Sequence, residues 1–213
     1  MLVISRSGTT VDVIDFLDRL PAGHRVAAII GDQASPLARL PQVVDLAFAD
    51  EVSVVQTRFA TTGLALLRAS LRLVPPTLLE DATAATAMAL PVEDLQALRQ
   101  VVFLGHRWTN GLAQEAALKL REAAGMWTEA YPVMEYQHGP ISCAGPRSLI
   151  WAFEPVPASV EAGIRATGAQ LYVPPVDPQA SMVAVHRLAL ALALAAGRDP
   201  DRPPHLSRSV VAV

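Results

Sequence analysis

The chain has 213 residues, of which 52% are hydrophobic and 17% charged, and its formal net charge is −3. Enough apolar residues are present to form a buried core, so the composition excludes a disordered chain. A slightly acidic protein without a stripe of lysine and arginine is not expected to have nucleic acid as its main partner.

The cysteine content and the apolar segments indicate a compartment. The single cysteine, Cys143, excludes an internal disulfide, and we expect it to be a small core residue in a reducing environment. The most apolar run, LALALALAA at 188–196, is far shorter than the roughly 20 residues of a membrane span. The N-terminus also lacks the basic region of a signal peptide. The sequence therefore predicts a cytoplasmic protein without membrane contact.

Strand-like and helix-like segments alternate in the first part of the chain. Short β-branched and apolar runs predict buried strands over residues 2–5, 25–30 and 43–48. Helical spacing of apolar residues is found over residues 11–20, 57–73 and 82–90, with a short helix or turn at 37–40. A Pro75-Pro76 pair separates the last two long helices.

The alternation starts again at residue 101. Predicted strands cover VVFLG (101–105), SLIWAF (148–153) and QLYV (170–173), and predicted helices cover 111–124, 160–166 and 180–196. Strands that alternate with helices form parallel sheets flanked by helices, a three-layer α/β/α arrangement. We therefore predict an α/β fold of two similar units, over residues 1–90 and 101–213, joined by a polar linker at 91–100.

The segment SRSGTT, which begins at Ser5, joins the first predicted strand to the first predicted helix. Backbone N–H groups and the macrodipole favour an anion at a helix N-terminus. The hydroxyls of Ser5, Ser7, Thr9 and Thr10 could donate to phosphate oxygens, and Gly8 lets the backbone approach closely. The alternative is that Ser7 or Thr9 simply caps the helix. Taken alone, the segment does not decide between a phosphate loop and a helix cap.

Longer segments resemble the sugar isomerase (SIS) family of phosphosugar-binding proteins. SRSGTT, SPLARLPQVVDLAF (35–48) and DEVSVVQTRFATT (50–62) are similar to the first domain of that family. FLGHRWTNGLAQEAALKLREAAGMWTEAYPVMEYQHGP is similar to the second domain of tandem members, such as the isomerase half of the glucosamine-6-phosphate synthases and the fructosamine-6-phosphate deglycases. The C-terminal HLSRSVVAV resembles the tail that folds over their active site. The resemblance implies two SIS-type units, of which the first is incomplete at its N-terminus.

The resemblance also implies a sugar-phosphate loop in the first unit. Ser5, Ser7 and Thr10 match the positions that bind the phosphate in the family, with Arg6 between the serines and Gly8 after them.

Further site residues follow from the same resemblance. Glu115 matches the carboxylate that moves a proton between C1 and C2 of the open-chain sugar. His138 matches the histidine assigned to ring opening, which in the family reaches a neighbouring subunit's site. Val54 and the Ser207–Arg208 pair match positions that line the sugar pocket.

These residue types suit the chemistry. Aldose–ketose interconversion needs a base that removes a proton from carbon and returns it one carbon away, and a partly buried glutamate serves this purpose. Glu115 lies among alanines and leucines, with Lys119 four residues further on. The alternatives are a surface salt bridge between Glu115 and Lys119, and a structural role for His138 at its Gly-Pro turn. The five histidines show no metal-ligand spacing, so we expect neither a metal nor another cofactor.

Two features depart from the family pattern. Arg208 stands where the synthases carry a lysine, and an arginine stays charged and forms no imine. In addition, the family carries a segment before SRSGTT, with a strand ending in Gly-x-Gly-Thr-Ser, that is absent here. A truncated start, a remnant completed by a partner, and a protein that binds without catalysis remain open as explanations. We expect the apolar surface and sheet edge left exposed to be covered in a homo-oligomer, such as a dimer.

The sequence thus gives two hypotheses. The first is an aldose–ketose isomerase, or a deglycase-like enzyme, that acts on a hexose or amino-sugar 6-phosphate. The second is a non-catalytic module that binds or senses a phosphosugar and has lost turnover.

Overall fold

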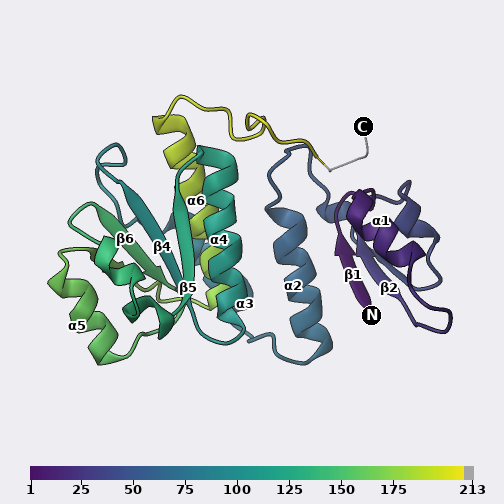
Figure 1. Ribbon diagram of the computed structural model, residues 1–213, viewed down its shortest axis with the longest axis horizontal. Helices are drawn as coiled ribbons and strands as arrows, with labels where there is room; N and C mark the ends of the chain where they lie inside the picture. The colour runs from purple at the N-terminus through teal and green to yellow at the C-terminus, as the bar shows by residue number, and fades with distance from the viewer. Residues whose placement is uncertain (209–213) are drawn as a thin grey trace. The chain divides into compact units, whose positions relative to one another are not determined.

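The computed structural model describes residues 1–208, and this chain divides into two compact units (Figure 1). The first unit comprises Met1–Val74 and the tail from Pro204, and the second comprises Pro75–Pro203. Each unit has its own parallel sheet, so the predicted α/β class is confirmed.

The first unit is a three-stranded sheet with helices on both faces. Its elements are β1 (Leu2–Ser5), α1 (Val11–Asp18), β2 (Ala27–Ile30), η1 (Pro36–Arg39), β3 (Val43–Asp45), η2 (Ala47–Ala49) and α2 (Arg58–Ser70). The strand order is β1-β2-β3, all parallel, with Leu2 opposite Ala27 and Ala28 opposite Val43.

Alternation along β2 builds the core of the first unit. Ala28 and Ile30 pack with Val13 and Leu17 of α1, whereas Ile29 faces the other way and packs with Phe59 of α2. Because side chains in a strand point to opposite faces in turn, one short apolar strand supports a helix on each side.

Strand β1 is one of the two edge strands of this sheet. Leu2 is 45% exposed and Ile4 is 48% exposed. Apolar side chains are therefore partly exposed at this edge of the sheet.

The second unit is a four-stranded sheet, also covered on both faces. Its elements are α3 (Leu78–Ala87), β4 (Gln100–Gly105), α4 (Thr109–Ala124), β5 (Thr128–Pro132), η3 (Glu135–Gln137), η4 (Pro140–Cys143), β6 (Ser148–Ala152), α5 (Ala158–Ala166), β7 (Gln170–Tyr172) and α6 (Pro178–Ala195). The order is β5-β4-β6-β7, and all pairs are parallel.

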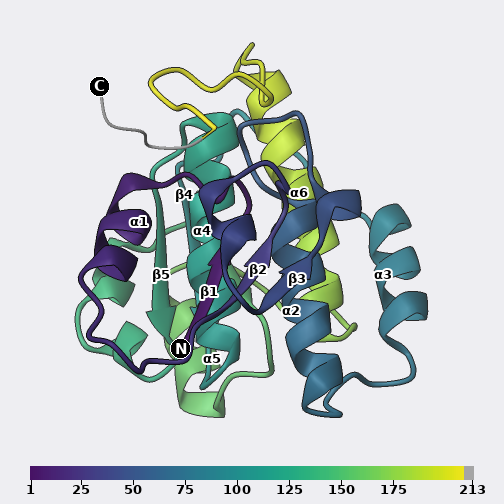
Figure 2. The same ribbon diagram turned by 90° about the vertical axis from the view of Figure 1, so that its right-hand side faces the viewer.

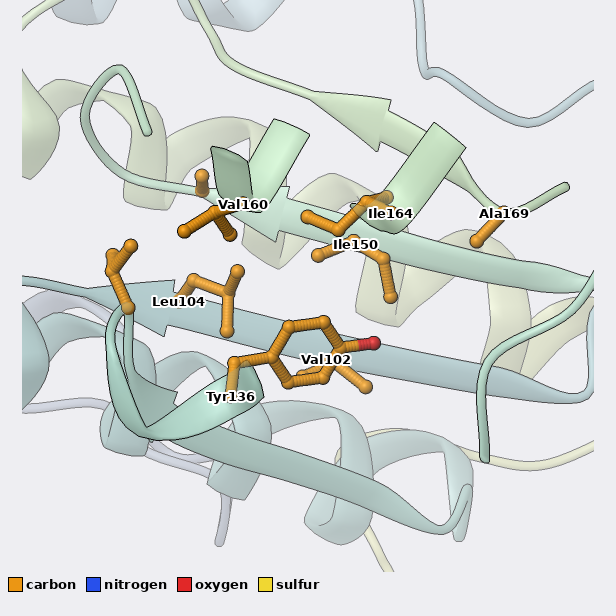
Figure 3. Close-up of a cluster of buried hydrophobic side chains, with 9 residues drawn as sticks. Val102, Leu104, Tyr136, Ile150, Val160, Ile164 and Ala169 are labelled. Atoms are coloured by element: carbon orange, nitrogen blue, oxygen red, sulfur yellow. The ribbon is translucent and has the colours of Figure 1, made fainter. Parts of the chain in front are cut away.

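The two faces of this sheet have separate cores. Figure 3 shows one of them, in which Val102, Leu104 and Ile150 meet Val160 and Ile164 of α5. On the other side α4 and α6 pack against each other, and α4 contacts β4 and β5 (Figure 1). The three-layer arrangement predicted from the alternation is thus confirmed.

The boundaries of the units differ from the predicted ranges 1–90, 91–100 and 101–213. Helix α3 packs beside α6 in the second unit (Figure 2). The Asp177 N–H donates to the Asp81 carboxylate at 3.1 Å, and Arg187 donates to the carbonyl of Met88 at 2.5 Å. The tail, in contrast, joins the first unit through Arg208. The end of the predicted tail, residues 209–213, lies outside the described residues.

Two further expectations need correction. Cys143, at the end of η4, is exposed and is not a core residue. Helix α6 is longer than the run 188–196, and by length and composition it is long and apolar enough to cross a membrane. More than half of its apolar window is buried against other parts of the chain, and it contacts α3 and α4. It therefore packs as the core helix of the second unit.

Candidate functional site

The β1–α1 loop presents its serine hydroxyls in a fixed geometry. Gly8 has φ +62°, in the left-handed region that favours glycine, and this bend folds the loop back on itself. The Gly8 N–H donates to Ser5 Oγ at 3.0 Å, and the Thr9 N–H donates to Ser7 Oγ at 3.3 Å. Each serine oxygen thus accepts from the loop and keeps its own proton to donate. The bend at Gly8 thus places Ser5 and Ser7 in one hydrogen-bonded loop, and their role as phosphate ligands stays a prediction.

The N-termini of the two helices in the first unit differ. Thr10 is the N-cap residue of α1, and its side chain makes no capping hydrogen bond. Ser7 Oγ accepts from Thr9, which precedes the helix, so Ser7 is not a helix cap.

Helix α2, by contrast, has a carboxylate at its N-terminus. Glu51 accepts hydrogen bonds from the Thr57 N–H and hydroxyl at 2.8 and 2.7 Å, and from the N–H groups of Arg58 and Phe59. Burial alone would raise the pKa of Glu51, but these hydrogen bonds outweigh it and lower the pKa below its usual value. The chain thus fills the anion position of α2 with its own side chain.

Arg6 is one of the largest buried side chains, with only 2% of its surface exposed. Its Nη1 donates to the Ser53 carbonyl at 2.7 Å, and its Nη2 donates to the carbonyls of Val54 at 3.1 Å and Arg208 at 3.4 Å. The guanidinium group therefore braces the segment after η2 against β1. Its role as a phosphate ligand stays a prediction.

Arg208 anchors the tail to the first unit. Its Nη2 lies 2.7 and 2.5 Å from the two carboxylate oxygens of Asp50, and its Nη1 donates to the Glu51 carbonyl at 2.6 Å. Ser207, beside it, is exposed. The structure thus brings Arg6, Val54 and Arg208 together through hydrogen bonds from Arg6 to the backbone carbonyls of the other two.

In the second unit, Glu115 belongs to a cluster of three charges on α4. The Lys119 Nζ lies 3.3 Å from Glu115 and 2.7 Å from Glu122, and only 3% of Lys119 is exposed. Glu115 and Lys119 therefore do not form a surface salt bridge, because Lys119 is buried between the partly buried carboxylates of Glu115 and Glu122. Sequence analysis missed Glu122, although its spacing of three residues from Lys119 places both on one helix face.

His138 lies between η3 and η4 and is exposed. Its backbone N–H donates to the Glu135 carbonyl at 3.0 Å, and Gly139 after it has φ +134°. The backbone is thus fixed by the turn, whereas the imidazole faces solvent.

A further cavity lies at the carboxyl ends of β4, β5 and β6. Its volume is about 470 Å³, and it is lined by His106, Val133, Met134, Glu154, Pro155, Val156 and Pro157. Thr109 Oγ1 donates to Glu154 at 2.7 Å and holds its carboxylate. No three His, Cys, Asp or Glu side chains within residues 1–208 are grouped so that they could hold a metal ion.

The parallel sheets and their flanking helices place the chain in the α/β class, and a loop with two serine hydroxyls follows β1 in the first unit. No protein-family model matches the chain. A glutamine–fructose-6-phosphate aminotransferase (isomerizing) of Thermus thermophilus is 28% identical over an alignment of 265 positions, gaps included, and this alignment covers 98% of this chain and 43% of that protein. The enzyme of Gluconobacter oxydans is also 28% identical, over 98% of this chain and 43% of its own length. The chain thus spans less than half the length of these curated relatives.

Solved structures share the fold. A glucosamine-6-phosphate deaminase from Thermotoga maritima superposes with a TM-score of 0.81 at 24% identity, over 99% of this chain and 75% of that one. A tagatose-6-phosphate ketose/aldose isomerase from Escherichia coli gives a TM-score of 0.71 at 18% identity, over 94% and 69%. The chain is thus related to the isomerase (SIS) domain of the aminotransferases, and it has the fold of the SIS phosphosugar isomerases.

The extent of this likeness corrects one expectation. The sequence predicted two SIS-type units, but the chain covers one SIS unit and not two. The first sheet has only three strands, and the matched region extends over both compact units. The roles assigned to individual site residues remain predictions.

Proposed function

We propose that the chain binds a sugar phosphate, with the phosphate at the β1–α1 loop of the first unit. The observation that carries this proposal is the contrast between two helix N-termini. Glu51 already occupies that of α2, whereas the N-cap side chain of α1 leaves its helix uncapped beside two serine hydroxyls. The relation to phosphosugar-acting proteins supports a hexose or amino-sugar 6-phosphate as the ligand.

The loop offers an anion both donors and a favourable field. The Ser5 and Ser7 hydroxyls keep protons to donate, and hydrogen bonds to a charged group contribute about 1.5–3 kcal/mol each. The positive end of the α1 dipole adds a smaller term that is screened by salt. Thr10, at the start of the helix, supplies a third hydroxyl.

We also propose that the protein isomerises, or deglycates, its sugar phosphate. Glu115 is the proton shuttle of this proposal and His138 the ring-opening acid and base. Lys119, buried beside Glu115, orients the carboxylate. Val54, Ser207 and Arg208 are the proposed pocket residues of the first unit.

The binding proposal is tested by titration calorimetry with glucose 6-phosphate and with glucose. We expect binding heat with glucose 6-phosphate and none with glucose, and the affinity for glucose 6-phosphate should fall as salt is added. Ser7→Ala should weaken binding about tenfold, because one donor to a charged group is lost. Ser70→Ala, an exposed site on α2, is the control and should change nothing. Equal binding of glucose and glucose 6-phosphate would contradict the proposal.

The catalytic proposal is tested by isomerisation of glucose 6-phosphate. Glu115→Gln should abolish turnover and leave binding within a few fold. Glu122→Gln is the matched variant, because it removes the other carboxylate on Lys119. If only Glu122→Gln loses turnover, Glu122 and not Glu115 is the proton shuttle, and the assignment of Glu115 is wrong. Binding without turnover in the parent would favour the second candidate, a non-catalytic phosphosugar sensor.

We further propose that the protein works as a cytoplasmic homodimer. The exposed apolar side chains of the edge strand β1 support an assembly that covers them. Sedimentation at micromolar concentration should report twice the chain mass, and a monomer at all concentrations would contradict this proposal.

A further inference from the structure

Ser35 stands out among the buried polar residues of the first unit. It follows β2 and is the N-cap residue of η1, with only 3% of its surface exposed. Its hydroxyl oxygen is buried and has no hydrogen-bond partner within residues 1–208. Its backbone is fixed, since the Ser35 N–H donates to the Asp32 carbonyl and the Ala38 N–H donates to the Ser35 carbonyl.

The Ser35 side chain lies against the β1–α1 loop. A Cβ at position 8 would overlap both the hydroxyl oxygen and the Cβ of Ser35. Glycine at this position therefore does more than allow φ +62°, because it leaves the space that the Ser35 hydroxyl occupies. A hydroxyl from the loop that follows β2 is thus brought to the bend that carries the Ser5 and Ser7 hydroxyls.

A buried hydroxyl without a partner destabilises the protein, because it loses its hydrogen bonds to water and gains none. Alanine would fill nearly the same space without this cost. Such unsatisfied groups are uncommon in folded proteins. An anion bound at the β1–α1 loop would offer the Ser35 hydroxyl an oxygen as hydrogen-bond acceptor.

We propose that Ser35 donates a hydrogen bond to the phosphate of the ligand held at the β1–α1 loop. This inference rests on the proposed function and adds a donor from a second strand to it. The phosphate is then held from two adjacent strand ends of the sheet, by Ser5 and Ser7 after β1 and by Ser35 after β2.

Two variants of Ser35 separate a ligand donor from a structural hydroxyl. Ser35→Ala should unfold at the same or a higher denaturant concentration than the parent, because it removes an unsatisfied group. Its affinity for glucose 6-phosphate should fall about tenfold. Ser35→Cys keeps the shape of the side chain but replaces the hydroxyl by a larger, weakly donating thiol, and it should lose affinity to at least the same extent.

Ser148→Ala is the matched control, because Ser148 is equally buried but satisfied. Its hydroxyl accepts from the Gly145 N–H at 3.1 Å and donates to Gln100 at 2.8 Å. This variant should lower stability and leave the affinity for glucose 6-phosphate unchanged.

The outcomes distinguish this inference from the proposed function. If the parent does not bind glucose 6-phosphate, the proposed function and the inference fail together. If the parent binds and both Ser35 variants bind equally well, the inference alone fails. If Ser35→Ala is less stable than the parent, the hydroxyl has a structural role and the inference is overturned. The same conclusion follows if neither Ser35→Ala nor Ser35→Cys folds.

Discussion

At the scale of single residues, the contacts of the buried Arg6 are those of a structural residue. Its guanidinium donates to the carbonyls of Ser53, Val54 and Arg208, three groups that would lose a donor if it were removed. Arginine suits this position because its planar fork presents several donors in fixed directions. Sequence analysis assigned Arg6 to the phosphate loop from its position between the two serines. That position does not show in which direction a long side chain points.

Arg6→Ala therefore tests which role dominates. We expect the free energy of unfolding to fall by about 2–4 kcal/mol, because buried carbonyls lose their donors and a cavity is left. Urea denaturation followed by circular dichroism measures this change. A variant that keeps its stability but loses affinity for glucose 6-phosphate would show that Arg6 is a ligand and not a brace.

At the scale of elements, the N-terminus of α2 depends on one ionised carboxylate. Hydrogen bonds from Thr57, Arg58 and Phe59 outweigh the burial of Glu51 and lower its pKa below 4.5. A group whose pKa is lowered by folding stabilises the folded state above its unfolded pKa. This stabilisation is lost as the pH falls through the folded-state pKa.

Glu51→Gln mimics the protonated form and should unfold about 1–2 kcal/mol more easily at neutral pH. The difference between the variant and the parent should narrow as the pH falls through the lowered folded-state pKa of Glu51, because the parent carboxylate is then protonated as well. Urea denaturation across this range is the measurement. A constant difference at every pH would mean that the charge of Glu51 does not stabilise α2.

The elements that sequence analysis predicted are those with a strong apolar signal. β4 and β6 are runs of buried residues, and their predicted positions agree with the structure within one residue at each end. β5 was missed because TEAYP is a half-exposed edge strand that contains a glutamate and ends in proline. The loop hydroxyls were predicted from a local motif, and Glu122 could have been found from its spacing of three residues from Lys119. Ser35 became visible only when folding brought it beside Gly8.

At the scale of the whole molecule, the chain has two units with separate cores. Ile29 is buried in the first unit with Phe59, and Ile150 is buried in the second with Leu104 and Val160. No side chain of one of these hydrophobic clusters belongs to the other. Domains with their own cores are able to unfold as separate cooperative steps.

Calorimetry of core variants tests this division. Ile29→Ala and Ile150→Ala should each cost about 2–5 kcal/mol, since each leaves a cavity in a packed cluster. We expect each substitution to lower the melting temperature of its own unit and to leave the other transition in place. A single transition that both variants shift equally would show that the two units fold as one.

The central claim is that an anion binds at the N-terminus of α1 and not at that of α2. Backbone amide shifts in nuclear magnetic resonance spectra, followed during titration with glucose 6-phosphate, test it most directly. The account predicts the largest shifts from Ser5 to Asp12, with little change at Thr57, Arg58 and Phe59, where Glu51 already holds the amides. Shifts confined to residues 57–59, or an unchanged loop at saturating sugar phosphate, would contradict it.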